Sequence, residues 1–446
     1  MSSLSTATLE AAGFTPAEAA RRLEQFALVD RAWTDFSPAR LPTLAYHVPG
    51  RIEVLGKHTD YAGGRSLVAA TEQGLVVKAL PRTDRTIRVV DAVSREMRSL
   101  VMSPDLVAPR GDWSNYPATV ARRFAADFGP LCGADIVFAS DLPFAAGVSS
   151  SSAIVVAMAM VLIDGNELAS QPPYLANIVD QEALGGYLGA VENGRPFGTL
   201  GSSAGVGTMG GSQDQTAILC SRENALTQYR FDPVVLEGTV AWPEGWVFAI
   251  GVSGVVAEKT GNAIEHYNGL ARLTARLARV AQTVSEGRYS TLGSALMDWP
   301  EGPGAIADRL KGLGLVERES LERRLTQLTA ECRTIIPGVV AALARRDFGA
   351  VGTLVAASQQ AAEFGLGNQI AETRALVELA RQHGAVAASA FGAGFGGSVW
   401  AMIDRANADR FVREWRHSYL ERFPEHGKTA QVVLTRPGLP ATRLHR

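Results

Sequence analysis

The sequence has few cysteines, little net charge and no long hydrophobic run. Its three cysteines, Cys132, Cys220 and Cys332, are far apart and form no CxxC pair, which argues against a zinc site or a disulfide framework. This cysteine usage is typical of a reducing cytoplasm, so we expect a cytoplasmic protein. The net charge of −2 offers no electrostatic footprint for nucleic acid or an anionic membrane. The longest apolar run, residues 153–163, is too short to cross a bilayer, and the N-terminus lacks the charged-then-apolar order of a signal peptide.

The length and composition indicate a globular protein with more than one core. A chain of 446 residues is too long for one ordinary hydrophobic core, so we expect two domains. Apolar residues make up 46% and charged residues 20%, as in soluble globular proteins. Local patterns predict both helices and strands. The strands are expected at residues 51–55, 75–80, 86–90, 135–138, 246–252, 399–403 and 432–434. The helices are expected within 1–40, 113–128, 165–190, 260–284, 319–332, 339–344, 351–363 and 370–381, with a variable connection at 298–315.

A polar cluster follows a short strand near the N-terminal end. The strand at residues 52–55 runs into a glycine, and residues 57–61 then supply an ammonium, an imidazole, two hydroxyls and a carboxylate. Such a cluster suits a polyhydroxylated ligand, because each buried hydroxyl needs a hydrogen-bond partner. The alternative is an ordinary solvated loop.

A serine-rich loop precedes an apolar helix. Residues 141–153 contain four consecutive serines, at 149–152, and the helix is expected at 154–162. Exposed backbone N–H groups and a helix N-terminus make an anion site, and a serine hydroxyl can ligate a metal. The Gly-Lys-Ser/Thr of a P-loop is absent. Four serines exceed what a helix cap needs, so we favour phosphate binding over a capping role.

Two further segments carry weaker signals. Glu192 precedes a glycine-rich segment, residues 194–211, which is either a mobile active-site flap or a disordered loop without a role. Asp214 follows this segment and is a candidate general base, although most such aspartates are turn or cap residues. Residues 392–397 match a GxGxGG pattern, which alone could be a bulged hairpin loop.

Together these stretches resemble the GHMP kinase superfamily and, within it, the galactokinases. The first stretch is similar to the family signature at Gly50, Arg51, Gly56, His58, Thr59, Asp60, Tyr61 and Gly64. The second resembles the superfamily's phosphate loop at Pro143, Gly147, Ser149, Ser150 and Ser151. The third matches the C-terminal motif without a gap from Gly392 to Gly397. The resemblance spans residues 45 to 405.

The resemblance implies a two-domain α+β fold with the active site between the domains. Residues 1–235 would form a sugar- and phosphate-binding domain, and residues 236–446 the C-terminal kinase domain. The implied activity is ATP-dependent phosphorylation of the anomeric hydroxyl of galactose or a close relative, with ATP and Mg²⁺ as cofactors. The expected partners are therefore a small-molecule sugar and ATP, in a monomer or small homo-oligomer.

The resemblance also implies roles for individual residues. Asp214 would accept the proton of the C1 hydroxyl or orient that hydroxyl, and Arg51 would keep Asp214 ionised and offset charge in the transition state. The implied sugar contacts are Lys57, His58, Asp60 and Tyr267. The implied nucleotide or phosphate contacts are Gly147, Ser149, Ser150, Ser151, Trp113 and Gly394, and the implied metal ligands are Ser151 and Glu192.

The sequence departs from the galactokinase pattern at three points. Lys57 stands where galactokinases place a glutamate assigned to the sugar's C6 hydroxyl. One hypothesis is an anionic C6, as in galacturonate; others are a pentose such as arabinose, or a lysine that faces solvent or still donates to the C6 oxygen. The spacing from Glu192 to Asp214 is longer than usual, and Ser212 and Gln213 replace residues that are usually apolar.

Two other kinds of protein share the expected fold. Some members are sensors or co-regulators that bind ATP and sugar without turnover, but Arg51, Asp214 and the serine loop favour an enzyme. Others are kinases for mevalonate or homoserine, and the run from His58 to Tyr61 favours the galactokinase branch.

Overall fold

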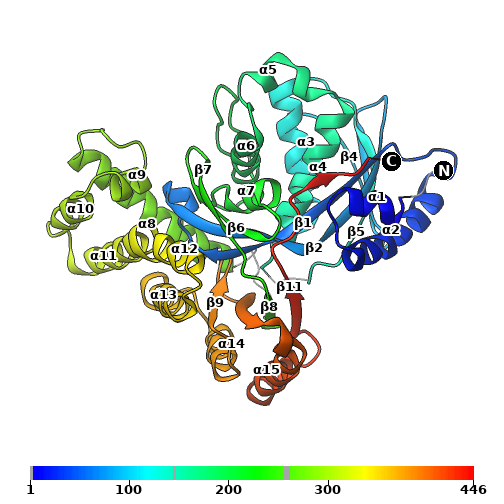
Figure 1. The fold of residues 1–446 in the computed structure, drawn as a ribbon. Helices are drawn as coiled ribbons and strands as arrows, with labels where there is room; N and C mark the ends of the chain where they lie inside the picture. Colours follow the sequence, from blue (N-terminus) through cyan, green and yellow to red (C-terminus); the bar gives the residue numbers. More distant parts are fainter. Residues whose placement is uncertain (1–3, 110, 144–146, 256–261, 446) are drawn as a thin grey trace.

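The computed structural model describes residues 4–109, 111–143, 147–255 and 262–445 (Figure 1). Residues 144–146 of the serine-rich stretch and residues 260–261 of an expected helix lie outside the described residues.

The first sheet contains the strand that leads into the polar cluster. Its described strands are β1 (Leu44–Leu55), β2 (Arg65–Pro81), β3 (Thr86–Asp91), β4 (Met97–Val101), β5 (Ala134–Ser140), β6 (Ala225–Arg230), β7 (Val235–Ala241) and β12 (Thr442–Arg443). They are ordered β12-β1-β2-β5-β3-β4, while β6 pairs with β2 and β7 pairs with β6. The pairing is antiparallel except between β3 and β5. The site-bearing β1 therefore lies between β12 and the long strand β2.

Helices cover both faces of this sheet. On one face lie α1 (Thr6–Ala11) and α2 (Pro16–Phe36), whose Phe26 and Trp33 are buried against Val76 and Val137. A capping box starts α2, since Thr15 and Glu18 satisfy each other's backbone N–H groups. The other face carries α3 (Asn115–Phe128), α4 (Ser150–Gly165), α5 (Pro172–Leu175), α6 (Gln181–Asn193) and α7 (Gln213–Cys220).

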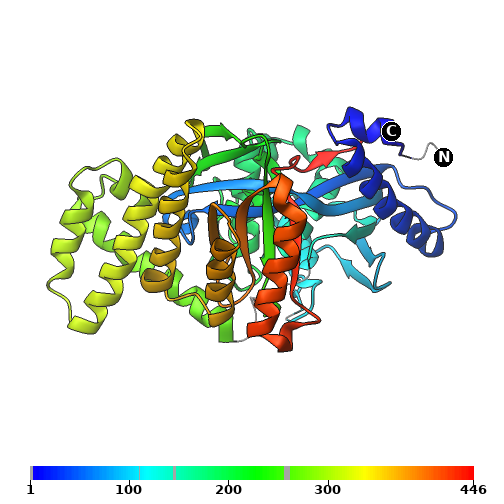
Figure 2. The ribbon, with the colours of Figure 1, turned by 60° about the horizontal axis from the view of Figure 1, so that its bottom comes forward.

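The second sheet is smaller and antiparallel, in the order β11-β8-β10-β9. Its strands are β8 (Trp246–Val252), β9 (Ala387–Phe391), β10 (Ser398–Asp404) and β11 (Gln431–Thr435). Figure 2 shows α14 (Ala371–Gln382) and α15 (Ala408–Arg422) lying along one of its faces. On β10, the Trp400 indole donates to the Val54 carbonyl at 3.1 Å, so the second sheet packs directly on β1.

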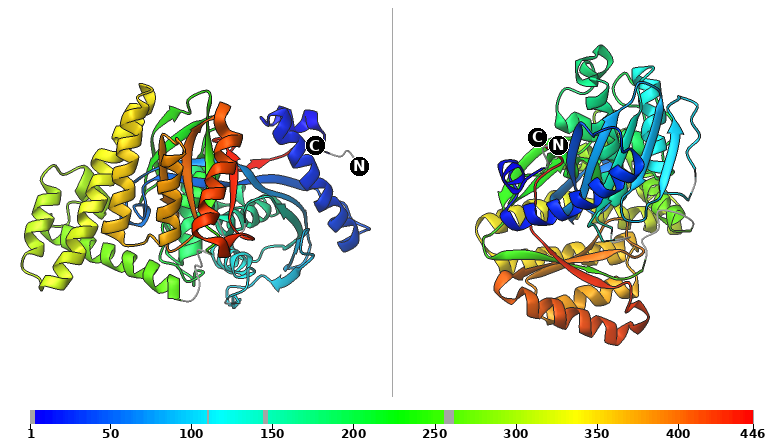
Figure 3. Two further views of the ribbon diagram at one scale, coloured as in Figure 1. Left: turned by 90° about the horizontal axis from the view of Figure 1, so that it is seen from below. Right: turned by 90° about the vertical axis from the view of Figure 1, so that its right-hand side faces the viewer.

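The remaining helices lie between residues 262 and 360. They are α8 (Asn262–Val284), α9 (Leu292–Met297), α10 (Gly302–Leu310), α11 (Leu315–Ala330), α12 (Ile336–Ala344) and α13 (Phe348–Gln360). Helices α8 to α11 form the end of the molecule opposite the two chain termini (Figure 3). Residues 298–315, which were expected to form a variable connection, contain the helix α10. Its Ile306 and Leu310, four residues apart on one helix face, are both fully buried.

Two sheets with helices packed on them confirm the predicted α+β class. Strands β7 and β12 join the first sheet, although they begin at or after residue 235. Residues on both sides of the predicted domain boundary therefore contribute to that sheet. The domain division at residue 235 stays a prediction. In the part of the chain that the structure describes, no helix combines the length and apolarity that a membrane crossing needs.

Candidate active site

Strand β1 presents Arg51 and Glu53 on one face. Residues two apart on a strand share a face, and Arg51 pairs with Ala70 and Glu53 with Val68 on β2. The register shifts immediately before Arg51 and again after Glu53. Such bulges redirect side chains locally, and here they bracket the two charged residues.

The serine-rich loop is attached to this strand. The Arg51 backbone N–H donates to the Val148 carbonyl at 3.1 Å, and the Arg51 guanidinium donates to the Gly147 carbonyl. Ser149 has a φ of 59°, in the left-handed region, and α4 starts at the next residue. The loop thus places the positive end of α4 next to the Arg51 side chain, an arrangement that favours anions.

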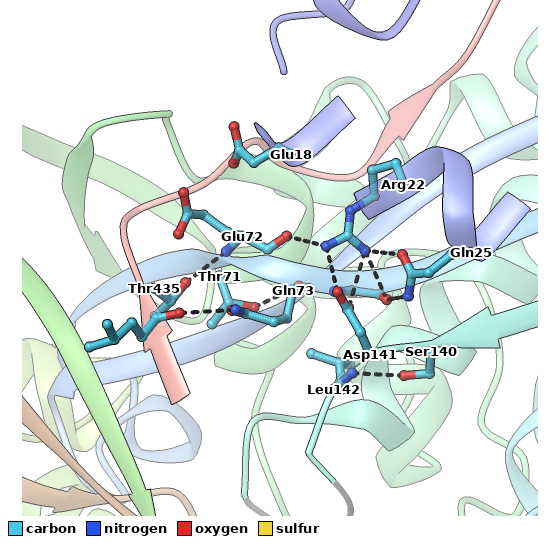
Figure 4. Close-up of polar contacts among 12 residues, drawn as sticks. Glu18, Arg22, Gln25, Thr71, Glu72, Gln73, Ser140, Asp141, Leu142 and Thr435 are labelled. Atoms are coloured by element: carbon cyan, nitrogen blue, oxygen red, sulfur yellow. Dashed lines mark hydrogen bonds and ion pairs between the residues drawn. The ribbon is translucent and has the colours of Figure 1, made fainter. Parts of the chain in front are cut away.

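An N-terminal helix fixes the start of the same loop (Figure 4). Arg22 of α2 is fully buried and donates to both carboxylate oxygens of Asp141, at 2.7 and 3.1 Å. Its guanidinium also donates to the Glu72 carbonyl, while Asp141 accepts from the Gly74 backbone N–H at 2.7 Å. This fork-like pair holds the residue where β5 ends and the loop begins.

Asp214 lies between Arg51 and the serine loop. Its Oδ1 accepts from the Arg51 Nε at 2.8 Å, and its Oδ2 accepts from the Ser149 hydroxyl at 2.5 Å. Asp214 is in the first turn of α7, so its carboxylate also lies at a helix N-terminus, where negative charge is stabilised. Two residues 163 positions apart in sequence therefore form one ion pair at the edge of the phosphate loop.

Glu192, near the end of α6, lies beside Ser152 and Asp214. Its Oε2 accepts from the Ser152 hydroxyl at 3.0 Å and from the Gln215 side chain at 2.5 Å. Ser152 is also 3.5 Å from the Asp214 Oδ2. The long spacing between Glu192 and Asp214 therefore does not separate them in space. Ser152 thus links Glu192 to Asp214, while Ser151, the predicted metal ligand, lines the adjoining cleft.

A polar pocket opens beside the ion pair. Its lining consists of Arg51, Glu53, His58, Asp60, Gln213, Asp214, Tyr267, Gly392 and Ala393. His58 bonds the Tyr61 hydroxyl at 2.9 Å and the Ala393 carbonyl at 3.0 Å. Burial, followed by the charge of the neighbouring Asp214, raises the pKa of Asp60. Three of the four predicted sugar contacts, His58, Asp60 and Tyr267, are brought together here.

The glycine turn at residues 392–397 closes one side of this pocket. Gly392 and Gly394 both have a φ of 79°, in the left-handed region that glycine adopts without strain. Phe395, with a φ of 58°, lies in the same region. A Cβ on Gly392 would lie 3.4 Å from the Gly147 carbonyl, so the turn packs against the phosphate loop. Gly394 itself packs on Asn368 and does not line the pocket; its neighbour Ala393 does.

A larger cleft of about 480 Å³ adjoins the polar pocket. Gly147, Ser149, Ser150 and Ser151 line one part of it, and Trp113, Tyr116 and Phe138 supply aromatic surface in another. The Trp113 indole donates to Glu96 at 3.1 Å and meets the Phe138 ring edge to face. The cleft thus combines a serine-rich loop and helix N-terminus that suit an anion with an aromatic pocket that suits a base.

Lys57 is the predicted sugar contact that lies elsewhere. It is 1% exposed, and its ammonium donates to the hydroxyls of Ser358 at 3.1 Å and Ser389 at 2.8 Å. Ser358 in turn donates to Glu331, which is fully buried. Burial lowers the pKa of Lys57, and the Glu331 carboxylate opposes that shift. This placement corrects the prediction that Lys57 faces the sugar and removes the geometric basis of the galacturonate hypothesis.

The glycine-rich segment at residues 194–211 is held in place at several points. The Asn193 side chain donates to the Gly211 carbonyl and accepts from the Gly210 N–H, at 2.8 and 2.7 Å. The Asn268 side chain accepts from the Met209 N–H at 2.9 Å. The C-terminal part of the segment therefore packs beside the pocket, which argues against a disordered loop without a role.

We expect Gly211→Ala to weaken sugar binding. A Cβ at Gly211 would lie 2.3 Å from the Asp60 Oδ2 and 2.8 Å from the Tyr61 backbone nitrogen, so the Asp60 carboxylate and the adjoining backbone must move. The expected result is an increase in KM for the sugar of about tenfold, the typical cost of one displaced polar contact. Gly201→Ala is the matched control in the same segment, because no heavy atom lies within 4 Å of its added Cβ. Equal KM values for the two variants, measured in steady-state assays, would contradict this prediction.

Three residues of the site were not predicted from the sequence. Glu53 and Gln213 line the pocket, and Ser152 bonds Glu192. The spacing of Glu53 two residues after Arg51 on an expected strand was an available signal, since both side chains must share a face. For Ser152, the run of four serines did not indicate which hydroxyl would contact Glu192.

Protein-family models match three segments of this chain. A model described as a galactokinase galactose-binding signature matches residues 36–80. Models of the GHMP kinase N-terminal domain and C-terminal region match residues 115–190 and 339–421. These segments contain the polar cluster, the serine loop and the glycine turn.

Similar proteins of known sequence and structure are kinases. A galactokinase of Chloroflexus aggregans (strain MD-66 / DSM 9485) is 26% identical over 406 residues, covering 89% of this chain and 92% of the relative. A galactokinase of Roseiflexus sp. (strain RS-1) is 25% identical over 403 residues, covering 89% and 91%. The crystal structure of Lactococcus lactis galactokinase complexed with galactose has a TM-score of 0.74 at 20% identity, covering 93% of this chain and 98% of that one. A mevalonate kinase structure has a TM-score of 0.52. At these identities the structures establish the fold.

The matched models and the two adjoining pockets define the class of the protein: it is a kinase of the GHMP superfamily, a phosphotransferase whose acceptor is an alcohol group. Within that superfamily the chain is similar to galactokinases, through the match to their galactose-binding signature and the two galactokinase relatives.

Proposed function

We propose that the protein transfers the γ-phosphoryl group of ATP to the anomeric hydroxyl of galactose or a closely related neutral sugar. The main support is the position of the Arg51–Asp214 ion pair. Arg51 lines both the polar pocket and the larger cleft, so a sugar in one and ATP in the other would meet at this pair. The galactokinase relatives and the match to a galactose-binding signature support galactose as the first candidate.

The proposed chemistry assigns separate tasks to the two charged side chains. Asp214 orients the sugar hydroxyl and accepts its proton, because its carboxylate lies in the pocket and is held by Arg51 and Ser149. Arg51 offsets the negative charge that develops on the transferred phosphoryl group. The Gly147–Ser149 backbone and the N-terminus of α4 hold the nucleotide phosphates. His58, Asp60 and Tyr267 hydrogen-bond the sugar.

Mg²⁺ is proposed as the second cofactor. Magnesium in kinases is bound by one or two carboxylates and by substrate phosphates, and it prefers oxygen ligands. Glu192 supplies a carboxylate behind the phosphate loop, and Ser151 supplies a hydroxyl in the cleft. Among the described residues, no group of three acidic, histidine or cysteine side chains could hold a metal alone. That fits an ion whose coordination the nucleotide completes, and Mg²⁺ would neutralise phosphate charge there.

The test is a phosphorylation assay with ATP and Mg²⁺ on galactose, arabinose and galacturonate, followed by NMR to locate the phosphate. We expect galactose 1-phosphate as the preferred product. A phosphate on another hydroxyl, or turnover of galacturonate in preference to both neutral sugars, would contradict the proposal.

A further inference from the structure

Glu53 is a buried carboxylate in the polar pocket that the proposed mechanism leaves without a task. It is 4% exposed, and its Oε2 accepts from the Gln213 side chain at 2.8 Å. The Gln213 Oε1 accepts from the Ser66 hydroxyl at 2.5 Å, which orients the amide so that its nitrogen faces Glu53. One oxygen of the carboxylate is thus fixed by the protein.

The second oxygen is left without a partner from the protein. Among the residues that the structure describes, the Oε1 of Glu53 has no hydrogen-bond partner, although it is buried. A buried acceptor without a partner costs roughly 1–3 kcal/mol, and more when it is charged. Because Glu53 lines the pocket together with Asp60 and Asp214, a hydroxyl group of a bound sugar is the natural donor.

The lining of this pocket carries more acidic than basic side chains, and the charges acting most strongly on Glu53 itself are those of Arg51 and Lys57. The pocket lining carries the carboxyl groups of Glu53, Asp60 and Asp214 against the guanidinium of Arg51 and the imidazole of His58. Arg51 is already paired with Asp214 at 2.8 Å. Burial raises the pKa of Glu53 to about 7, and Arg51 and Lys57 limit this rise. An anionic sugar would therefore meet like charge in this pocket once Glu53 has lost its proton.

We propose that Glu53 is a specificity-determining residue, whose Oε1 accepts a hydrogen bond from a sugar hydroxyl and whose negative charge excludes uronic acids. This inference rests on the proposed function, because it takes the ligand of the pocket to be a sugar. It names the substrate class more closely, as neutral sugars, and it adds a residue that the sequence comparison did not assign.

The inference predicts opposite pH dependences for two sugars. A charged acceptor forms the stronger hydrogen bond, so galactose binds more tightly as pH rises through 7 and Glu53 ionises. With a pKa of about 7, the ionised fraction rises about tenfold between pH 6 and pH 8, which sets the expected gain in affinity at about tenfold. Galacturonate stays anionic over this range, so its affinity falls as pH rises.

The experiment is calorimetric titration of the full chain with galactose and with galacturonate at pH 6, 7 and 8. It compares the wild type with Glu53→Gln and with Glu244→Gln, an exposed carboxylate that controls for the change in net charge. We expect Glu53→Gln to bind galactose at least about tenfold more weakly at pH 8. We also expect the affinity ratio of galacturonate to galactose to rise, and both pH dependences to disappear. Glu244→Gln should behave as the wild type does.

Other outcomes would overturn the inference. The titratable or charged groups facing Glu53 are Arg51, Lys57, His58, Asp60, Asp214 and Tyr267. If the pH dependence persists in Glu53→Gln, it belongs to one of those groups and not to Glu53. If the wild type shows no opposite slopes, the inference fails even where the variant does not fold. Binding of neither sugar would refute both proposals, whereas the expected binding pattern without phosphoryl transfer would refute the proposed function alone.

Discussion

Replacing Asp214 by alanine is expected to reduce kcat by about 10²–10⁴-fold, the usual contribution of a general base, while ATP binding changes little. The reason is that the Asp214 carboxylate lies in the polar pocket, beside Arg51 and Ser149. Asp214 is not among the residues that line the larger cleft, in which Trp113 supplies aromatic surface. Single-turnover rates and nucleotide titrations measure the two quantities separately.

Asp214→Asn tests the role of the carboxylate more specifically than Asp214→Ala does. Alanine leaves the guanidinium of Arg51, which is 3% exposed, without its carboxylate and so also lowers stability. Asparagine keeps the size and an acceptor for Arg51 and removes only the charge and the proton acceptor. Turnover within threefold of the wild type in Asp214→Asn would refute the proposed role of Asp214 as a base.

Replacing Lys57 is expected to destabilise the fold, with no direct effect on which sugar is bound. Lys57→Met would remove the stronger of the two cations that act on buried Glu331, the other being Arg324. Loss of one member of a buried charge pair typically costs about 3–5 kcal/mol. Lys57→Glu would place a second carboxylate beside Glu331 and should be more damaging still. The measurement is the free energy of unfolding in urea. Lys428→Met is the control, because Lys428 is exposed and should change stability by less than about 0.5 kcal/mol.

A double-mutant cycle identifies the partner of Lys57. We expect Lys57→Met and Glu331→Gln together to cost less than the sum of the single changes, with a coupling of about 0.5–3 kcal/mol. The Lys57 ammonium and Glu331 are bridged by the Ser358 hydroxyl, so removing both charges leaves neither buried alone. Additive effects, or a switch in sugar preference with unchanged stability, would contradict this account.

The sequence carried most of the information about the catalytic centre. The fold class and the enzyme class were implied by the resemblance of three short motifs to those of the GHMP kinases. Asp214 and the serine run were named from their residue types, Arg51 and Glu192 through the resemblance, and the structure brings them together.

The environment of Lys57 could not be predicted in the same way. It depends on Ser358 and Ser389, which are 301 and 332 positions away in the chain. No local pattern records such a contact, so a lysine within a binding motif was assigned to the ligand. The same limit applies to Arg22, whose partner Asp141 is 119 positions away and belongs to another element.

The residue types at positions 53 and 57 are better understood together. Lys57, directly after β1, turns away from the pocket and Glu53 turns into it, so the buried stretch holds one charge of each sign on opposite sides. The charge of Lys57 is one of the two that limit the rise in the pKa of Glu53. A substitution at position 57 should therefore be interpreted together with position 53.

The shared wall between the two pockets has a thermodynamic consequence. Arg51 and Ala393 line both the polar pocket and the larger cleft, so the proposed sugar and ATP would contact the same two residues. If bound sugar changes the affinity for ATP by some factor, bound ATP changes the affinity for the sugar by the same factor. Where the two proposed ligands change each other's affinity, each dissociation constant has meaning only at a stated concentration of the other ligand.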